Sequence, residues 1–91
     1  MIIKYNDNEL LYLISEKDEV ALEIMMNKYE PLIKSMLVRY KIKSKNFEDF
    51  YQECLMTLYN CVNKYREDRK ISFNSYLEMS LNYCIQNILK K

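Results

Sequence analysis

The stretch DFYQECLMTLYNCVNKY, residues 49–65, has the spacing of a two-sided helix. Its apolar residues recur every third or fourth position and, with the preceding phenylalanine, define one side: Phe47, Phe50, Tyr51, Cys54, Leu58, Cys61, Val62 and Tyr65. The opposite side is a continuous polar strip, with Tyr59 beside it: Asp49, Gln52, Glu53, Met56 and Asn60. A methionine in the middle of such a strip indicates either a docking surface, where it fills a pocket of a partner, or a solvated face with one stray apolar residue.

Helical spacing also runs through the sequence before this stretch. The pattern predicts a first helix, capped by Asp7 or Asn8 and ending near Glu16. It predicts a second helix, capped by Asp18 and ending near residue 40, whose apolar face carries Val20, Ala21, Ile24, Met25 and Tyr29. We expect a bend near Pro31, because proline cannot donate its backbone hydrogen bond inside a helix.

The basic and polar residues 41–46 are the expected connection to the helix that begins near Phe47 and ends near Tyr65, with Asn46 as its cap. A charged segment, residues 66–72, follows. The last expected helix begins near Ser72 and continues to the end of the chain. Its predicted apolar stripe is Leu77, Leu81, Cys84 and Ile88.

Composition points to an all-α fold, a compact bundle of about four helices in a single domain, residues 1–91. The chain has no glycine and one proline, whereas a small sheet protein needs glycine in its tight turns. Nearly half of the residues are apolar, enough for a core without metals or disulfides. No segment has the length of a membrane span and the N-terminus is not a signal peptide, so we expect a cytoplasmic protein without membrane contacts.

The sequence offers little for catalysis. Histidine is absent, and no glycine-rich phosphate loop or cofactor motif occurs, so we expect neither an enzyme nor a cofactor or metal site. Asp49 and Glu53 lie one turn apart, where carboxylates are normally solvated. The odd set of Cys54, Cys61 and Cys84 indicates buried thiols of a reducing compartment, with a thiol switch as the alternative.

Residues 71–91 combine aromatic rings with amides, and basic residues that include Arg69 and Lys70 flank them. Bases of single-stranded nucleic acid stack on rings such as Phe73, Tyr76 and Tyr83, while amides read base edges. The alternative is that the first two rings belong to the core. Fourteen Lys and Arg nearly balance thirteen Asp and Glu, so a domain of this kind would need a larger partner to hold DNA.

Several short motifs occur in a fixed order: Tyr29-Glu30-Pro31-Leu32-Ile33, Asp49-Phe50-Tyr51-Gln52-Glu53, Leu58, Lys64-Tyr65 and Phe73-Asn74-Ser75-Tyr76. In this order and spacing, residues 7–91 resemble region 2 of the bacterial sigma-70 family of RNA polymerase initiation factors. The resemblance implies a transcription initiation factor that binds the polymerase core and recognises and melts the promoter −10 element.

The resemblance assigns two surfaces. Its docking helix binds the clamp helices of the polymerase β′ subunit, and this maps to Asp49, Gln52, Glu53, Met56, Tyr59 and Asn60. Its charged linker and last helix bind the non-template strand of the −10 element, which maps to Arg69, Lys70, Ile71, Phe73, Tyr76, Met79, Ser80, Asn82, Tyr83, Gln86 and Asn87. An anti-sigma factor is a further candidate partner.

The chain also departs from the family. Met79 and Ser80 stand where primary members have two tryptophans, which indicates an alternative, non-housekeeping factor. The family's C-terminal domain for the −35 element has no counterpart, so we expect a fragment of a longer protein. The competing interpretation is a helical interaction module, or a regulator that mimics the sigma docking face without opening DNA. A mimic would have no reason to keep the rings of residues 73–83 together.

Overall fold

The computed structural model describes residues 6–66 and 70–90, and within these ranges the chain forms four α-helices and no strand. The helices are α1 (Asp7–Ser15), α2 (Glu19–Arg39), α3 (Ser44–Lys64) and α4 (Phe73–Leu89). The all-α bundle of four helices that the composition and spacing predict is therefore confirmed.

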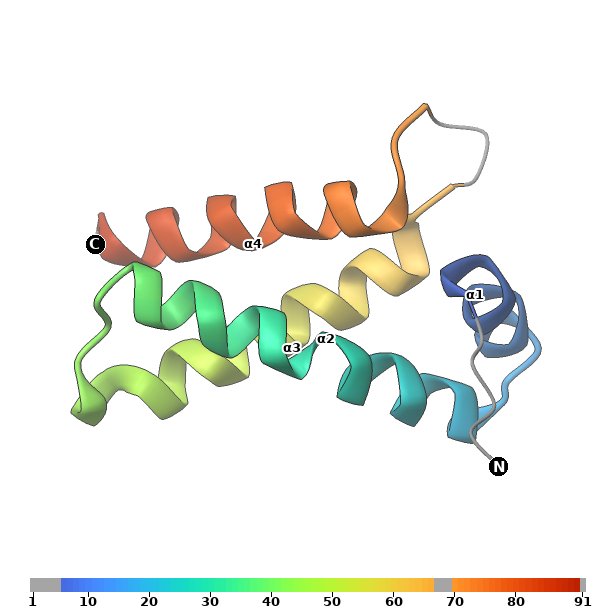
Figure 1. Ribbon diagram of the computed structural model, residues 1–91, viewed down its shortest axis with the longest axis horizontal. Coiled ribbons are helices and arrows are strands. Elements are labelled where there is room, and N and C mark those ends of the chain that lie inside the picture. Colours follow the sequence, from blue (N-terminus) through green and yellow to red (C-terminus); the bar gives the residue numbers. More distant parts are fainter. Residues whose placement is uncertain (1–5, 67–69, 91) are drawn as a thin grey trace.

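The long helix α3 packs against both α2 and α4, while α1 packs against α2. In Figure 1, α4 runs antiparallel to α3, and α1 is seen nearly end-on beside the start of α2. All four helices contribute to one core, whose members are Leu10, Ala21, Met25, Tyr29, Ile33, Met36, Leu37, Cys54, Leu58, Cys61, Val62, Phe73, Leu77, Leu81 and Ile85. Among the described residues the buried core contains no polar or charged side chain, so it is held by apolar packing.

Two tight reversals connect α1 to α2 and α2 to α3. Each places a lysine in the left-handed region, Lys17 with φ 69° and Lys41 with φ 58°. After α2, the Ile42 N–H donates to the Leu37 carbonyl oxygen at 3.1 Å, which is the long hydrogen bond of a Schellman motif. Glycine usually takes this left-handed position, but the chain has none, so each lysine carries a conformational cost of about 1 kcal/mol.

The helix caps agree only in part with the predicted ones. Asp18 caps α2 as predicted, since its carboxylate accepts the backbone N–H groups of the second and third helical residues. The cap of α1 is Asn6 rather than Asp7 or Asn8. The Asn6 side chain accepts the Glu9 N–H at 2.8 Å, and Glu9 accepts the Asn6 N–H in return. This reciprocal pair is a capping box, and it places the N-cap of α1 one residue before Asp7, the first of the two predicted caps.

The loop between α2 and α3 is shorter than predicted. The helix α3 begins at Ser44 with Lys43 as its N-cap, so Asn46 lies inside the first turn and does not cap it. The Schellman motif after α2 reverses the chain within a few residues, which lets α3 start before Phe47. The helix α2 itself continues through Pro31, an exposed position where water can replace the missing backbone hydrogen bond.

Two predicted apolar stripes are rotated relative to the observed ones. In α4, Ile85 is fully buried, whereas Cys84 and Ile88 are only half-buried. In α2, Val20 and Ile24 are exposed rather than in the core. The buried residues of α4 are spaced four apart: Phe73, Leu77, Leu81 and Ile85. Because a helical turn has 3.6 residues, this stripe shifts gradually around the helix and leaves the predicted one.

Candidate functional site

The six side chains that the sequence places on the polar side of α3 are all exposed, and together they are called here the α3 strip: Asp49, Gln52, Glu53, Met56, Tyr59 and Asn60. Two of them are large and apolar, Met56 with 63% and Tyr59 with 50% of its surface exposed. Gln52 donates from its side-chain nitrogen to Glu48 at 2.9 Å, which orients its amide along the helix. The strip thus combines carboxylates, amides and apolar side chains on one accessible face.

The α3 strip is a ridge between two hollows. On one side, a hollow of about 330 Å³ lies against Met26 of α2 and continues along Gln52, Met56 and Tyr59. Another, of about 460 Å³, is lined by strip residues and by Ile88 of α4. A ridge with a depression on each flank can pack against a partner that itself presents ridges and grooves, as paired helices do.

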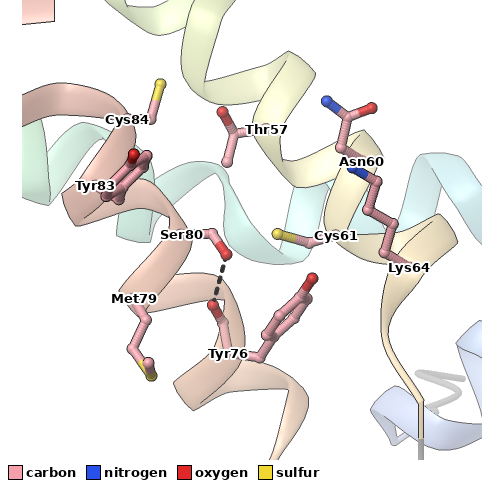
Figure 2. A pocket seen from close by; sticks show the side chains of 9 residues that line it. All are labelled: Thr57, Asn60, Cys61, Lys64, Tyr76, Met79, Ser80, Tyr83 and Cys84. Atoms are coloured by element: carbon pink, nitrogen blue, oxygen red, sulfur yellow. Dashed lines mark hydrogen bonds between the residues drawn. The ribbon is translucent and has the colours of Figure 1, made fainter. Parts of the chain in front are cut away.

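A surface groove of about 600 Å³ runs between α3 and α4 (Figure 2). Its lining is Thr57, Asn60, Cys61 and Lys64 from α3, and Tyr76, Met79, Ser80, Tyr83 and Cys84 from α4. Met79 and Tyr83 are 63% and 69% exposed. Ser80 donates from its hydroxyl to the Tyr76 carbonyl oxygen at 3.0 Å, so this hydroxyl is partly engaged by its own helix. The groove presents two aromatic rings, a thioether and one cation, to which a flat group such as a base could bind.

Four aromatic rings pack at the start of α4. The Phe73 ring contacts Tyr65 edge-on with the ring centroids 5.4 Å apart, and Tyr29 at 5.6 Å. Tyr76 in turn packs on Tyr65 at 5.8 Å, and the Tyr65 hydroxyl donates to the Ile71 carbonyl oxygen at 2.7 Å. Phe73 is only 2% exposed. This corrects the assignment of Phe73 to a base-stacking surface, because a ring buried against Tyr29 and Tyr65 supports its neighbours and has no free face.

Two amides of α4, those of Asn82 and Gln86, lie beside the end of α2. Asn82 accepts a hydrogen bond from the Tyr40 hydroxyl at 2.8 Å, and Gln86 donates to the same oxygen at 3.1 Å. Asn82 is half-buried and Gln86 is exposed, one helical turn further along. The predicted DNA-contacting residues of α4 are therefore divided between the groove side and this amide flank.

The remaining predicted DNA contacts lie around the linker and the end of α4. Ile71 is 38% exposed and Lys70 is exposed, both just before the cap of α4. Asn87 is half-buried. Arg69 lies outside the described residues.

Sequence reasoning missed three residues that the structure brings to these surfaces. Thr57 and Lys64 line the groove, because α4 lies along the flank of α3 rather than over its apolar side alone. Their spacing of seven residues, two turns on one helix flank, was the available signal. Tyr40 reaches α4 across more than forty residues of sequence, and no local pattern indicates such a contact.

The thiols are free, and two of them are buried. Burial raises the pKa of the Cys54 thiol to about 12, with smaller contributions from Cys84 and Glu53. Burial also raises the pKa of the Cys61 thiol, and the neighbouring Ser80 hydroxyl and the Lys64 charge partly oppose this. Because the thiolate is the reactive form, both core thiols are protected against oxidation at neutral pH.

Within residues 6–66 and 70–90, no group of histidine, cysteine or acidic side chains is arranged to hold a metal ion. No helix of the same ranges has the length and apolar character needed to cross a bilayer.

Comparison with known proteins gives matches of two kinds. The family model described as Sigma-70 region 2 matches residues 25–91. The RNA polymerase sigma-H factor of Bacillus licheniformis is 25% identical over 84 residues, and that of Bacillus subtilis (strain 168) is 24% identical over 84 residues. Each alignment covers 92% of this chain but 38% of the relative, so the chain spans well under half the length of these curated relatives. No solved structure gives a significant match.

Proposed function

The chain belongs to the sigma-70 region 2 family, and from this premise we propose that it is the part of a bacterial transcription initiation factor that docks on RNA polymerase and recognises and melts the promoter −10 element. The proposed domain extends over residues 1–91, beyond the matched range of 25–91. The packing of α1 supports this extension, since Leu10 is 1% exposed and belongs to the common core.

The observation that carries the proposal is a pair of exposed apolar ridges on adjacent helices. Met56 and Tyr59 rise from α3, and Met79 and Tyr83 rise from α4, each at least half exposed. Met79 and Tyr83 line the groove between α3 and α4, and Met56 and Tyr59 line the hollow beside α2. Single exposed apolar residues are ordinary, but two such pairs on neighbouring helices are typical of surfaces that bind partners.

Docking is proposed for the α3 strip, with the clamp helices of the polymerase β′ subunit as the partner. The carboxylates of Asp49 and Glu53 suit arginines of a partner helix, since arginine and carboxylate pair through two hydrogen bonds. Met56 stands between polar neighbours and fills a pocket without demanding one fixed shape. The hollows beside the strip support a two-helix partner, because ridges of one surface pack into grooves of the other.

DNA binding is proposed for the groove side of α4 and for the linker before it. The rings of Tyr76 and Tyr83, with Met79 between them, would stack on unpaired bases of the non-template strand. Lys64 at the groove and Lys70 in the linker would hold phosphates. Ile71, Ser80, Asn82, Gln86, Asn87 and Arg69 complete the proposed contact set. Phe73 is proposed to support this surface from the core and not to contact DNA.

The near-neutral charge of the chain is consistent with a factor that binds DNA tightly only when it is bound to the polymerase. A net charge of +1 is too small for independent tight binding to DNA, where phosphate contacts dominate. Once docked, the α4 face would meet DNA at the high effective concentration of an intramolecular reaction. Asn60 borders both the docking hollow and the DNA groove, so the two partners would lie side by side.

A DNA-binding experiment with a matched control tests the proposal. The chain, bound to core RNA polymerase of Bacillus subtilis, is titrated into a fluorescent pool of single-stranded DNA, and the polarisation is measured. We expect Tyr83→Ala to weaken binding about tenfold, the typical loss of one stacked base. Tyr12→Ala is the control, because Tyr12 is similarly exposed at 63% but lies on α1.

Three results are informative. Selective loss with Tyr83→Ala supports the DNA surface. Equal binding by wild type and both variants excludes the groove side of α4 as that surface. A chain that binds the polymerase but adds no DNA affinity would instead be a regulator that occupies the docking site without opening DNA.

A further inference from the structure

The hydroxyl of Tyr40 lies between two side-chain amides of α4. It donates to the Asn82 Oδ1 at 2.8 Å and accepts from the Gln86 Nε2 at 3.1 Å. Tyr40 is the C-cap of α2, and the C-terminal end of α2 lies beside the C-terminal half of α4 (Figure 1). One phenol of a neighbouring helix thus engages both amides of the flank.

These hydrogen bonds give each amide a defined direction. A phenol has a single proton to donate, and Asn82 receives it with its carbonyl oxygen, so the Asn82 amino group points away from Tyr40. Gln86 gives one of its two N–H groups to the phenol. Its carbonyl oxygen and its second N–H are left for another partner.

The phenol is itself held in place. Tyr40 is half-buried and packs against the core, and its backbone N–H donates to the Met36 carbonyl oxygen at 2.9 Å. The two residues that follow it form the Schellman motif that ends α2, through Lys41 and Ile42. A half-buried ring on a fixed helix end loses little entropy when it orients the amides, whereas an exposed glutamine alone samples many rotamers.

We propose that Tyr40 is a positioning residue for DNA readout, which fixes the Gln86 amide so that it reads an adenine edge of the promoter. This inference rests on the proposed function of α4. A free carbonyl oxygen and a free N–H on one amide match the N6 donor and N7 acceptor of adenine in the major groove. Asn82, with its amino group turned outward, presents donors to a neighbouring acceptor.

A selection experiment tests this role. The chain bound to core RNA polymerase of Bacillus subtilis selects from duplex DNA with a randomised −10 region, and sequencing gives the base preference at each position. The position read by Gln86 is the one whose preference disappears in Gln86→Ala. We expect adenine to be preferred there, and Tyr40→Phe to lower that preference about fivefold or more.

Other readouts separate positioning from a general structural effect. Tyr40→Phe keeps the ring and should leave unchanged the affinity for non-preferred sequences and the preferences at positions read by neither Gln86 nor Asn82. On a Gln86→Ala background it should add no further loss at the position that Gln86 reads, because there the two changes act through one contact. Tyr12→Phe, on α1, is the matched control and should retain the full preference.

The outcomes distinguish this inference from the proposed function. If Tyr40→Phe retains the wild-type preference, or lowers every preference equally, the positioning role is excluded while DNA readout by α4 stands. If Gln86→Ala changes no position, Gln86 is not a reading residue and the inference fails. If the wild-type complex selects no sequence, the proposed DNA function fails first.

Discussion

Replacing Phe73 by alanine separates a core role from a DNA-contacting role for this ring. Phe73 is 2% exposed and packs against Tyr29 and Tyr65. A ring in that position should affect the free energy of unfolding even when no DNA is present. A ring that only stacked on bases would leave stability unchanged.

The expected loss follows from burial. Truncation of a buried phenylalanine to alanine costs about 3–5 kcal/mol, which includes the two aromatic contacts. Phe73 is the first residue of α4, where the helix end can relax into the vacated space, so we expect the lower end, about 3 kcal/mol. A domain of 91 residues has a total stability of roughly 5–14 kcal/mol, so the variant should fold but should melt about 12–24 °C lower.

The assay is urea unfolding followed by circular dichroism, with Tyr83→Ala beside Phe73→Ala. Tyr83 is 69% exposed, so its truncation should change stability by no more than about 0.5 kcal/mol. Both variants should keep the wild-type denaturant dependence. A loss below about 1 kcal/mol for Phe73→Ala would refute the core assignment, because truncation of a buried phenylalanine typically costs about 3–5 kcal/mol.

Three further predictions concern backbone strain, pH and thiols. Lys17→Gly should raise stability by about 0.5–1 kcal/mol, because glycine adopts the left-handed conformation at φ 69° without strain; thermal unfolding measures this. Burial and the hydrogen bond to the Asp7 carboxylate raise the pKa of Tyr29 above its usual 10.0. Above pH 10 the phenol therefore loses its proton in the unfolded chain before it does so in the folded one. The free energy of unfolding should then fall by about 1.4 kcal/mol per pH unit. Tyr29→Phe should remove that part of the slope in alkaline unfolding curves. A thiol reagent should modify Cys84 in the native protein and reach Cys54 and Cys61 only on unfolding, as mass spectrometry would show.

Matched controls sharpen these tests. Lys45→Gly, within the first turn of α3, should destabilise rather than stabilise, and a gain there would contradict the strain argument at Lys17. Rapid native labelling of all three thiols would show that the core opens more readily than its packing implies.

Much of the fold was predictable from local patterns. The absence of glycine and the helical spacing indicate four helices, and Ser72 marks the start of α4 as its observed cap. The exposure of the α3 strip follows from the same spacing, because one face of α3 must be apolar and buried and Met56 lies opposite to it. These features depend on neighbours within one or two turns, which a sequence shows directly.

The features that were not predictable depend on contacts between helices. Nothing local distinguishes the buried Phe73 from the exposed Tyr83, since the difference comes from Tyr29 of α2 and Tyr65 at the C-cap of α3, whose rings pack on Phe73. The burial of Ile85 in place of Ile88 depends on how α4 rotates against its neighbours. The contact between Tyr40 and Gln86 joins the ends of two helices and has no sequence signature.

The most direct test of the account is binding of the chain to an isolated fragment of the β′ clamp helices, measured by isothermal titration calorimetry. The account predicts a Kd in the micromolar range or below, weakened about fivefold or more by Met56→Ala and by Gln52→Ala and unaffected by Tyr12→Ala. Both strip positions are exposed, so the variants should keep wild-type stability. Absence of binding by the wild-type chain would contradict the assignment of the α3 strip as the docking surface. So would a loss of affinity in Tyr12→Ala equal to that in the two strip variants.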